Sequence, residues 1–128
     1  MSHAESIVLA IAALNDFHNP ESHAFKLKNP MLLRSFAPDS RHSVDGDGVR
    51  VYKSAFSGLK SCVVDIDVKL SGKSVTGLRP DQTLQNLLKI LGVKTKEQQA
   101  FIVRFLREAI GDKNISLATP LRFFYEGK

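Results

Sequence analysis

The sequence predicts a single, mainly helical domain with one small β-hairpin, arranged around a central buried helix. Three observations carry this fold class. Several segments place apolar residues at intervals of three and four, as one face of a helix requires. Residues that can cap a helix precede these segments, and glycines follow most of them. Two short β-capable runs flank a glycine-rich turn. The length of 128 residues indicates one domain, residues 1–128.

The strongest periodic signal lies between Val51 and Gly72 and predicts the central helix. Ser54 is its expected N-cap and Gly72 its expected stop. Its helical stripe consists of Phe56, Leu59, Val63, Ile66 and Leu70. Further apolar residues widen this surface, so we expect the helix to be covered on more than one side: Cys62, Val64 and Val68.

The first helix is predicted from the pair Ser2 and Glu5, which has the spacing of a capping box. This helix should run to about Phe17. The segment from His18 to Met31 is rich in Asn, Pro, Ser, His and Lys, so it is predicted to be a long loop. Long ordered loops are often functional.

Three helices are predicted in the second half of the chain. One should open near Thr83 and stop at Gly92, and the next should span residues 95–111, with Thr95 and Gln98 as a second capping box. The last should begin with Thr119 as N-cap and Pro120 at the first helical position, and should dock through Leu121, Phe123 and Phe124.

The hairpin is predicted from two runs, Met31 to Phe36 and Val49 to Tyr52. The tetrapeptide Asp45-Gly46-Asp47-Gly48 between them resembles the opening of a calcium loop. It lacks the third acidic position and the distal glutamate, where Phe56 stands. A hairpin turn is therefore the preferred interpretation, and a metal site is the alternative.

Composition limits the class of protein. Hydrophobic residues make up 43% of the chain and charged residues 24%, as in ordinary globular proteins. No segment is long and apolar enough to span a membrane, and the N-terminus lacks the features of a signal peptide, so a cytoplasmic or virion-associated location is expected. The single cysteine, Cys62, is expected to be a buried, inert thiol. A net charge of +5 favours anionic partners.

The sequence signals for a cofactor site, a metal site or a nucleic-acid site are weak. We expect no cofactor and no metal, because phosphate-binding loops and nucleophile elbows are missing and the histidines lack ligand spacing: His3, His18, His23 and His42. Asp65 and Asp67 are expected to be solvated surface residues. A basic surface is expected around the loop and hairpin, from Lys26, Lys28, Arg34, Arg41, Arg50 and Lys53. Tyr52 is the one aromatic near it expected to face solvent, so specific nucleic-acid binding is disfavoured.

Three stretches, taken together, resemble the lysozyme-like domains of phage virion proteins and related lytic transglycosylase-type proteins. The first is Lys28-Asn29-Pro30-Met31-Leu32-Leu33-Arg34, which is similar to their Asn-Asn-Pro-Gly-Asn-Leu-Arg signature. The second is Val51 to Gly72, with Tyr52, Ser54, Phe56, Gly58, Leu59 and Cys62. The third is Thr76-Gly77-Leu78-Arg79-Pro80-Asp81 with Thr83-Leu84, and the closing Ala118-Thr119-Pro120-Leu121 extends the match.

The resemblance implies an α+β lysozyme-like fold and a glutamate at the end of the first helix that protonates the glycosidic oxygen. Anchored on Phe17, Pro20 and Ser22, that position is occupied here by Asn15, and an amide cannot act as the acid. The signature's Gly and Asn are also replaced, by the bulky Met31 and Leu32. The cleft residues that the resemblance implies are Asn15, Asn29, Arg34 and Tyr52.

Three hypotheses follow. The preferred hypothesis is a degenerate lysozyme-like module of a phage particle or phage-derived element that binds peptidoglycan or a protein partner. The second is an active peptidoglycan glycosidase or lytic transglycosylase that uses Asp16 or Glu21 as its acid. The third is a basic nucleic-acid-associated protein.

Overall fold

The computed structural model describes residues 3–34, 43–45, 48–73 and 76–126. Over these residues the chain is mainly helical, as predicted. The helices are α1 (Ala4–Leu14), α2 (His23–Leu27), α3 (Ala55–Leu70), α4 (Leu84–Ile90), α5 (Lys96–Ile110) and α6 (Leu121–Glu126). Two short strands, β1 (Ser43–Val44) and β2 (Arg50–Val51), pair antiparallel, with Ser43 opposite Val51.

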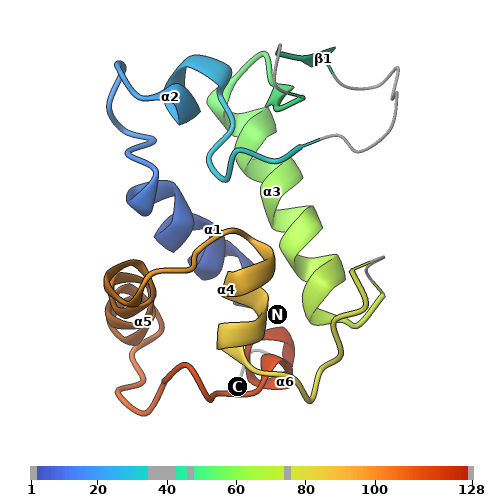
Figure 1. Cartoon of the computed structure of the whole chain (residues 1–128), viewed down its shortest axis with the longest axis vertical. Coiled ribbons are helices and arrows are strands. Elements are labelled where there is room, and N and C mark those ends of the chain that lie inside the picture. The colour runs from blue at the N-terminus through green and yellow to red at the C-terminus, as the bar shows by residue number, and fades with distance from the viewer. Residues whose placement is uncertain (1–2, 35–42, 46–47, 74–75, 127–128) are drawn as a thin grey trace.

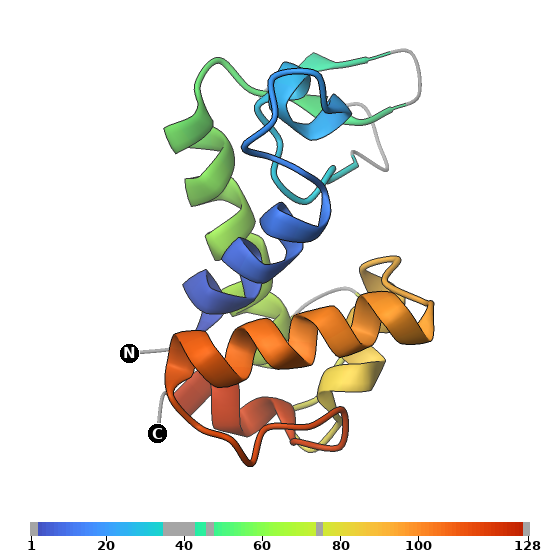
Figure 2. The same ribbon diagram turned by 90° about the vertical axis from the view of Figure 1, so that its left-hand side faces the viewer.

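The helix α3 connects the two ends of the molecule. Figures 1 and 2 show α2 and the hairpin gathered at one end of α3, and α4, α5 and α6 at the other. Between these groups α1 packs against both α3 and α5, and α6 packs against α3. The core therefore runs from α1 into the group of three C-terminal helices.

The central buried helix is α1, and the prediction that α3 is covered on several sides is wrong. The buried residues of α1 are Ala4, Ile7, Val8, Ala10, Ile11 and Ala12. On α3, by contrast, Phe56 is 75% exposed and Val64 is 57% exposed, and Val68 is also exposed. The buried face of α3 passes through Gly58, Cys62, Ile66 and Leu70, with Leu59 and Val63 half-buried beside it. Periodicity identifies positions that share a face, but it does not say which face other elements cover.

Three predicted N-caps are confirmed. The side chains of Ser54, Thr83 and Thr95 each accept a hydrogen bond from the backbone N–H three residues later. These bonds use donors that the first helical turn leaves unpaired. At the other end of α5, Gly111 has φ 80°, a conformation that stops the helix and that glycine adopts without strain.

The first helix is shorter than predicted at both ends. It begins at Ala4 with His3 in the N-cap position, and Ser2 lies outside the described residues. It ends at Leu14, rather than near Phe17, because the backbone turns left-handed at Asp16, where φ is 56°.

The segment 18–31 is not all loop, since it contains α2. The Ser22 hydroxyl accepts from the Phe25 N–H at 3.1 Å and so caps this five-residue helix. Turns and bends lie on both sides of α2, which explains why composition alone suggested a loop.

The hairpin is present, but its first strand is not the predicted one. Arg34 forms only an isolated bridge with Val49, and the strand that pairs with β2 is β1. At the turn, the Asp45 carboxylate accepts from the Val49 N–H at 3.0 Å. The two ends of the predicted turn, Asp45 and Gly48, connect β1 to β2, whereas Gly46 and Asp47 lie outside the described residues, as do Phe36, Arg41 and His42.

The last helix docks onto the body as predicted, because Leu121 and Phe124 are fully buried. It also meets the start of α1. The backbone N–H of His3 donates to the Phe124 carbonyl at 2.6 Å, and the ring of His3 stacks on Phe123 with centroids 5.8 Å apart. The first and last described helices therefore contact each other directly.

Candidate functional site

Asn15 ends α1 and is tied to the segment 28–34. Its side-chain Nδ2 donates to the Pro30 carbonyl at 3.0 Å. The residue occupies the C-cap position of α1 and is half-buried. The amide thus joins the end of the first helix to the loop that precedes the hairpin, and a carboxylate could not donate this bond.

The two carboxylates that the sequence analysis offered as candidate acids both lie at the surface. The Asp16 side chain is 63% exposed, with His18 Nε2 3.9 Å from its Oδ1. Glu21 is also exposed, and its backbone N–H donates to the Asn19 side chain. A glycosidase acid needs a poorly solvated wall that favours its protonated form. Neither Asp16 nor Glu21 has such surroundings.

Asn29 was predicted to face a ligand, but it has no exposed surface. Its Nδ2 donates to the carbonyls of Leu33 at 3.1 Å and Arg50 at 2.9 Å. Its Oδ1 accepts from the Leu33 N–H at 2.9 Å. Because buried polar groups must be paired, these bonds give Asn29 a structural role: it fastens the segment 28–34 to β2.

Tyr52 and Arg34, the other predicted cleft residues, flank the same segment. The Tyr52 hydroxyl shares a 2.6 Å hydrogen bond with Ser61 of α3 and lies 3.4 Å from Arg50 Nη1. The Tyr52 backbone N–H donates to the Leu27 carbonyl. Arg34 is exposed next to the hairpin. Of the four predicted cleft residues, Arg34 is the one with an exposed side chain.

The glycine at position 58 allows α3 to approach the segment 28–34 closely. A Cβ atom on Gly58 would lie 1.8 Å from the Lys28 carbonyl oxygen, so only glycine fits. Lys28 itself is left-handed, with φ 55°, and its Nζ lies 3.7 Å from the centre of the Phe25 ring. The segment 28–34 is therefore held by α1, α3 and β2 together.

The single thiol is buried, as predicted. Cys62 is fully buried in the core, and this burial raises the pKa of its thiol to about 12. A thiol protonated at neutral pH is a poor nucleophile and a poor metal ligand.

Two further polar groups on α3 differ from expectation. Asp65 was expected to be solvated, but it pairs with Lys69, whose side chain is only 10% exposed. Asp67 is half-buried. In the described ranges no three residues among His, Cys, Asp and Glu lie together as metal ligands would. His23 contacts Asp45 at 3.5 Å.

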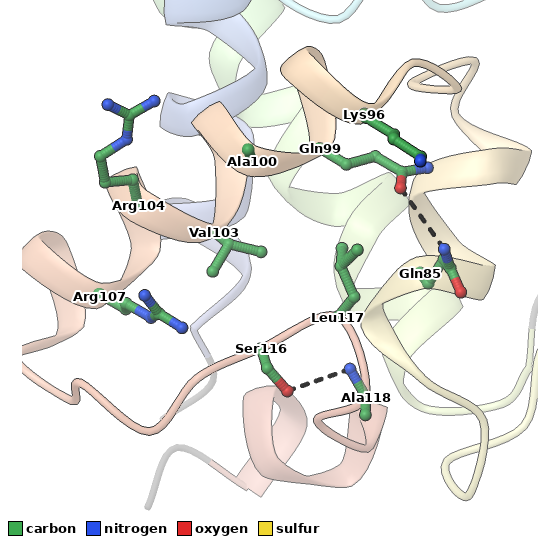
Figure 3. A pocket seen from close by; sticks show the side chains of 10 residues that line it. All are labelled: Gln85, Lys96, Gln99, Ala100, Val103, Arg104, Arg107, Ser116, Leu117 and Ala118. Atoms are coloured by element: carbon green, nitrogen blue, oxygen red, sulfur yellow. Dashed lines mark hydrogen bonds between the residues drawn. The ribbon is translucent and has the colours of Figure 1, made fainter.

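The structure also contains a hollow that sequence analysis missed. It measures about 800 Å³ and lies between α5, the start of α4 and the segment 116–118 (Figure 3). It is lined by Gln85, Lys96, Gln99, Ala100, Val103, Arg104, Arg107, Ser116, Leu117 and Ala118. We call it the α5 hollow. The spacing of Lys96, Arg104 and Arg107 on one side of a helix was the available signal, but the sequence does not show that the segment 116–118, which follows α5, folds back against it.

The chain shows no significant match to any protein-family model, curated protein or solved structure. Across the described ranges, no helix combines the length and apolar character needed to cross a membrane.

Proposed function

We propose that the protein is a catalytically inactive lysozyme-like module that binds peptidoglycan, as a virion-associated or phage-derived component. One observation carries the inactive part of this proposal. Asn15 stands at the position where the family that the sequence resembles has its acid. Its side-chain amide donates a hydrogen bond to the Pro30 carbonyl. The residue thus has a structural reason to be asparagine.

The second hypothesis, an active glycosidase, has less support. Asp16 and Glu21 are solvent-exposed on the turn after α1, and neither is lined by apolar groups that would favour a protonated carboxyl. Association with nucleic acid stays a prediction from net charge. A salt titration would test it, since phosphate contacts weaken steeply with added salt.

Binding is expected at the surface formed by the end of α1 and the segment 28–34. Arg34 is exposed there and can pair with carboxylates of the wall peptides. The matched control is Arg122, which is exposed on α6 at the other end of the molecule.

The test combines co-sedimentation with purified cell-wall sacculi and a turbidity assay on the same sacculi. Saturable sedimentation without loss of turbidity is expected. Arg34→Glu should weaken sedimentation by about fivefold, as loss of an exposed charge pair and added repulsion would. Arg122→Glu, the same charge change, should not.

Two results would overturn the proposal. Absence of sedimentation would remove wall binding. Lysis that disappears in Asp16→Ala or Glu21→Ala would establish the enzyme instead.

A further inference from the structure

The α5 hollow has a basic rim and an apolar floor. Three cationic residues, Lys96, Arg104 and Arg107, lie on one side of α5 and are exposed (Figure 3). The floor consists of small and aliphatic side chains: Ala100, Val103, Leu117 and Ala118. With about 100° of rotation per residue, this side of α5 differs from the side of Ile102 and Leu106, which is buried in the core. The rim is therefore on the solvent side of α5, whereas the floor adjoins the core, because Val103 belongs to the core cluster and Leu117 packs against it.

The rim of the hollow is positively charged. Among the described residues, no acidic side chain lines the hollow. In the part of the chain that the structure describes, none of the three rim cations forms an ion pair. Arg107 is oriented by the backbone, because its Nε donates to the Ile115 carbonyl at 2.8 Å. Three like charges beside an apolar surface favour an anionic partner.

One end of the hollow carries a fixed hydrogen-bond acceptor. Gln99 is only 4% exposed, and its Nε2 donates to the Val93 carbonyl at 3.0 Å, which sets the orientation of the amide. Gln85 Nε2 lies 3.5 Å from Gln99 Oε1, which is too long for a strong hydrogen bond (Figure 3). This oxygen can therefore accept from a ligand N–H.

We propose that the α5 hollow binds an acidic peptide segment of a partner protein. Carboxylates of the peptide would meet Lys96, Arg104 and Arg107, and an aliphatic side chain would cover Val103 and Leu117. A peptide N–H would donate to Gln99.

The lining favours a peptide over nucleic acid. A bound single strand stacks its bases on aromatic side chains, and none lines the hollow. An apolar floor next to arginines is instead typical of the anchor pockets in protein interfaces.

Fluorescence anisotropy with the full chain and a short labelled peptide of glutamate and leucine tests this proposal. Saturable binding is expected. A peptide of glutamate alone should bind more weakly, because it has no aliphatic side chain to cover the floor of the hollow. A lysine and leucine peptide should not bind.

The double variant Lys96→Ala with Arg104→Ala should weaken binding roughly five- to tenfold, as expected for two exposed charge pairs. Neither side chain makes a hydrogen bond or an ion pair across the described ranges, so the variant should fold normally. The matched control is Lys94→Ala with Lys113→Ala, which removes two exposed charges outside the hollow and should leave binding unchanged.

Equal loss in the control variant would overturn the proposal, because binding would then follow net charge alone. Failure of the peptide to bind would also overturn it, as would tighter binding of a single-stranded oligonucleotide that the double variant abolishes. This proposal does not depend on wall binding. The double variant should sediment with sacculi normally, so the two proposals can fail separately.

Discussion

Replacing Asn29 with aspartate changes the side chain from a donor and acceptor into an acceptor alone, with almost no change in shape. The wild-type amide donates to the carbonyls of Leu33 and Arg50 and accepts from the Leu33 N–H. At pH 7 Asn29→Asp keeps the accepted bond and loses both donated bonds. It also places a negative charge against two carbonyl oxygens, on a side chain without exposed surface.

The cost follows from these contacts. A buried polar group left without its partner costs about 1–3 kcal/mol, so two carbonyls predict a loss of about 4 kcal/mol in the free energy of unfolding. At this chain length, 1 kcal/mol shifts the thermal midpoint by about 4 °C, which predicts a fall of about 15 °C.

The loss should depend on pH. Burial and the facing carbonyls raise the pKa of the introduced carboxyl in the folded state above its usual value of about 3.9. The folded variant then binds a proton that the unfolded chain releases, so its deficit relative to wild type grows as pH rises and shrinks toward pH 4. A protonated carboxyl can donate one of the two lost bonds.

Thermal and urea unfolding followed by circular dichroism at pH 4 and pH 7 would measure both effects. The control is Asn19→Asp in the same region, because Asn19 uses its Oδ1 to accept from the Glu21 N–H and aspartate keeps that bond. Equal midpoints for the two variants at pH 7, or a deficit for Asn29→Asp that does not change with pH, would refute the reasoning.

Three further outcomes are expected. Gly58→Ala should lower the free energy of unfolding by about 1–3 kcal/mol in urea titrations, because its Cβ would overlap a backbone carbonyl; a neutral effect would contradict the close approach. The Cys62 thiol should react with a thiol reagent only after unfolding, and the protein should lose stability as pH rises above about 9, since burial raises the pKa of the folded thiol from its ordinary value of 9.0 to about 12; rapid labelling of the native protein would contradict burial. Asp65→Asn should cost about 1–3 kcal/mol by leaving Lys69 unpaired and nearly buried, whereas Asp67→Asn should cost little; equal effects would refute the pair.

The features that depend on a few neighbouring residues were the ones the sequence predicted well. Ser54, Thr83 and Thr95 cap their helices through bonds to the third residue along the chain. Gly111 stops α5 through its own backbone conformation. Ser22 had the same capping potential, but only five helical residues follow it, too few to show a periodic pattern.

Features that depend on distant contacts were predicted less well. The pattern of α3 identified Ile66 and Leu70 correctly as core, but it could not show that Phe56 lacks a covering element. Likewise, Asn29 was predicted to line a cleft, because a polar residue in a loop gives no sign that Arg50, far along the chain, supplies its partner.

The candidate sites show the same limit. The expectation that Asn15 cannot act as an acid needs only the chemistry of its amide, whereas its hydrogen bond to the Pro30 carbonyl could not be foreseen from the sequence. The α5 hollow required the segment 116–118 to fold back against α5, which no local pattern in Lys96, Arg104 and Arg107 indicates.

The burial of α1 has a consequence for the order of events during synthesis. Its apolar residues Ile7, Val8 and Ile11 are covered by α3 and α5, which leave the ribosome much later, and the N–H of His3 bonds to Phe124 in α6. Contacts between residues so far apart in sequence slow folding. A nascent chain that has completed α1 alone exposes one of the most apolar surfaces of the protein, so we expect stable structure to form only after α5 has been translated.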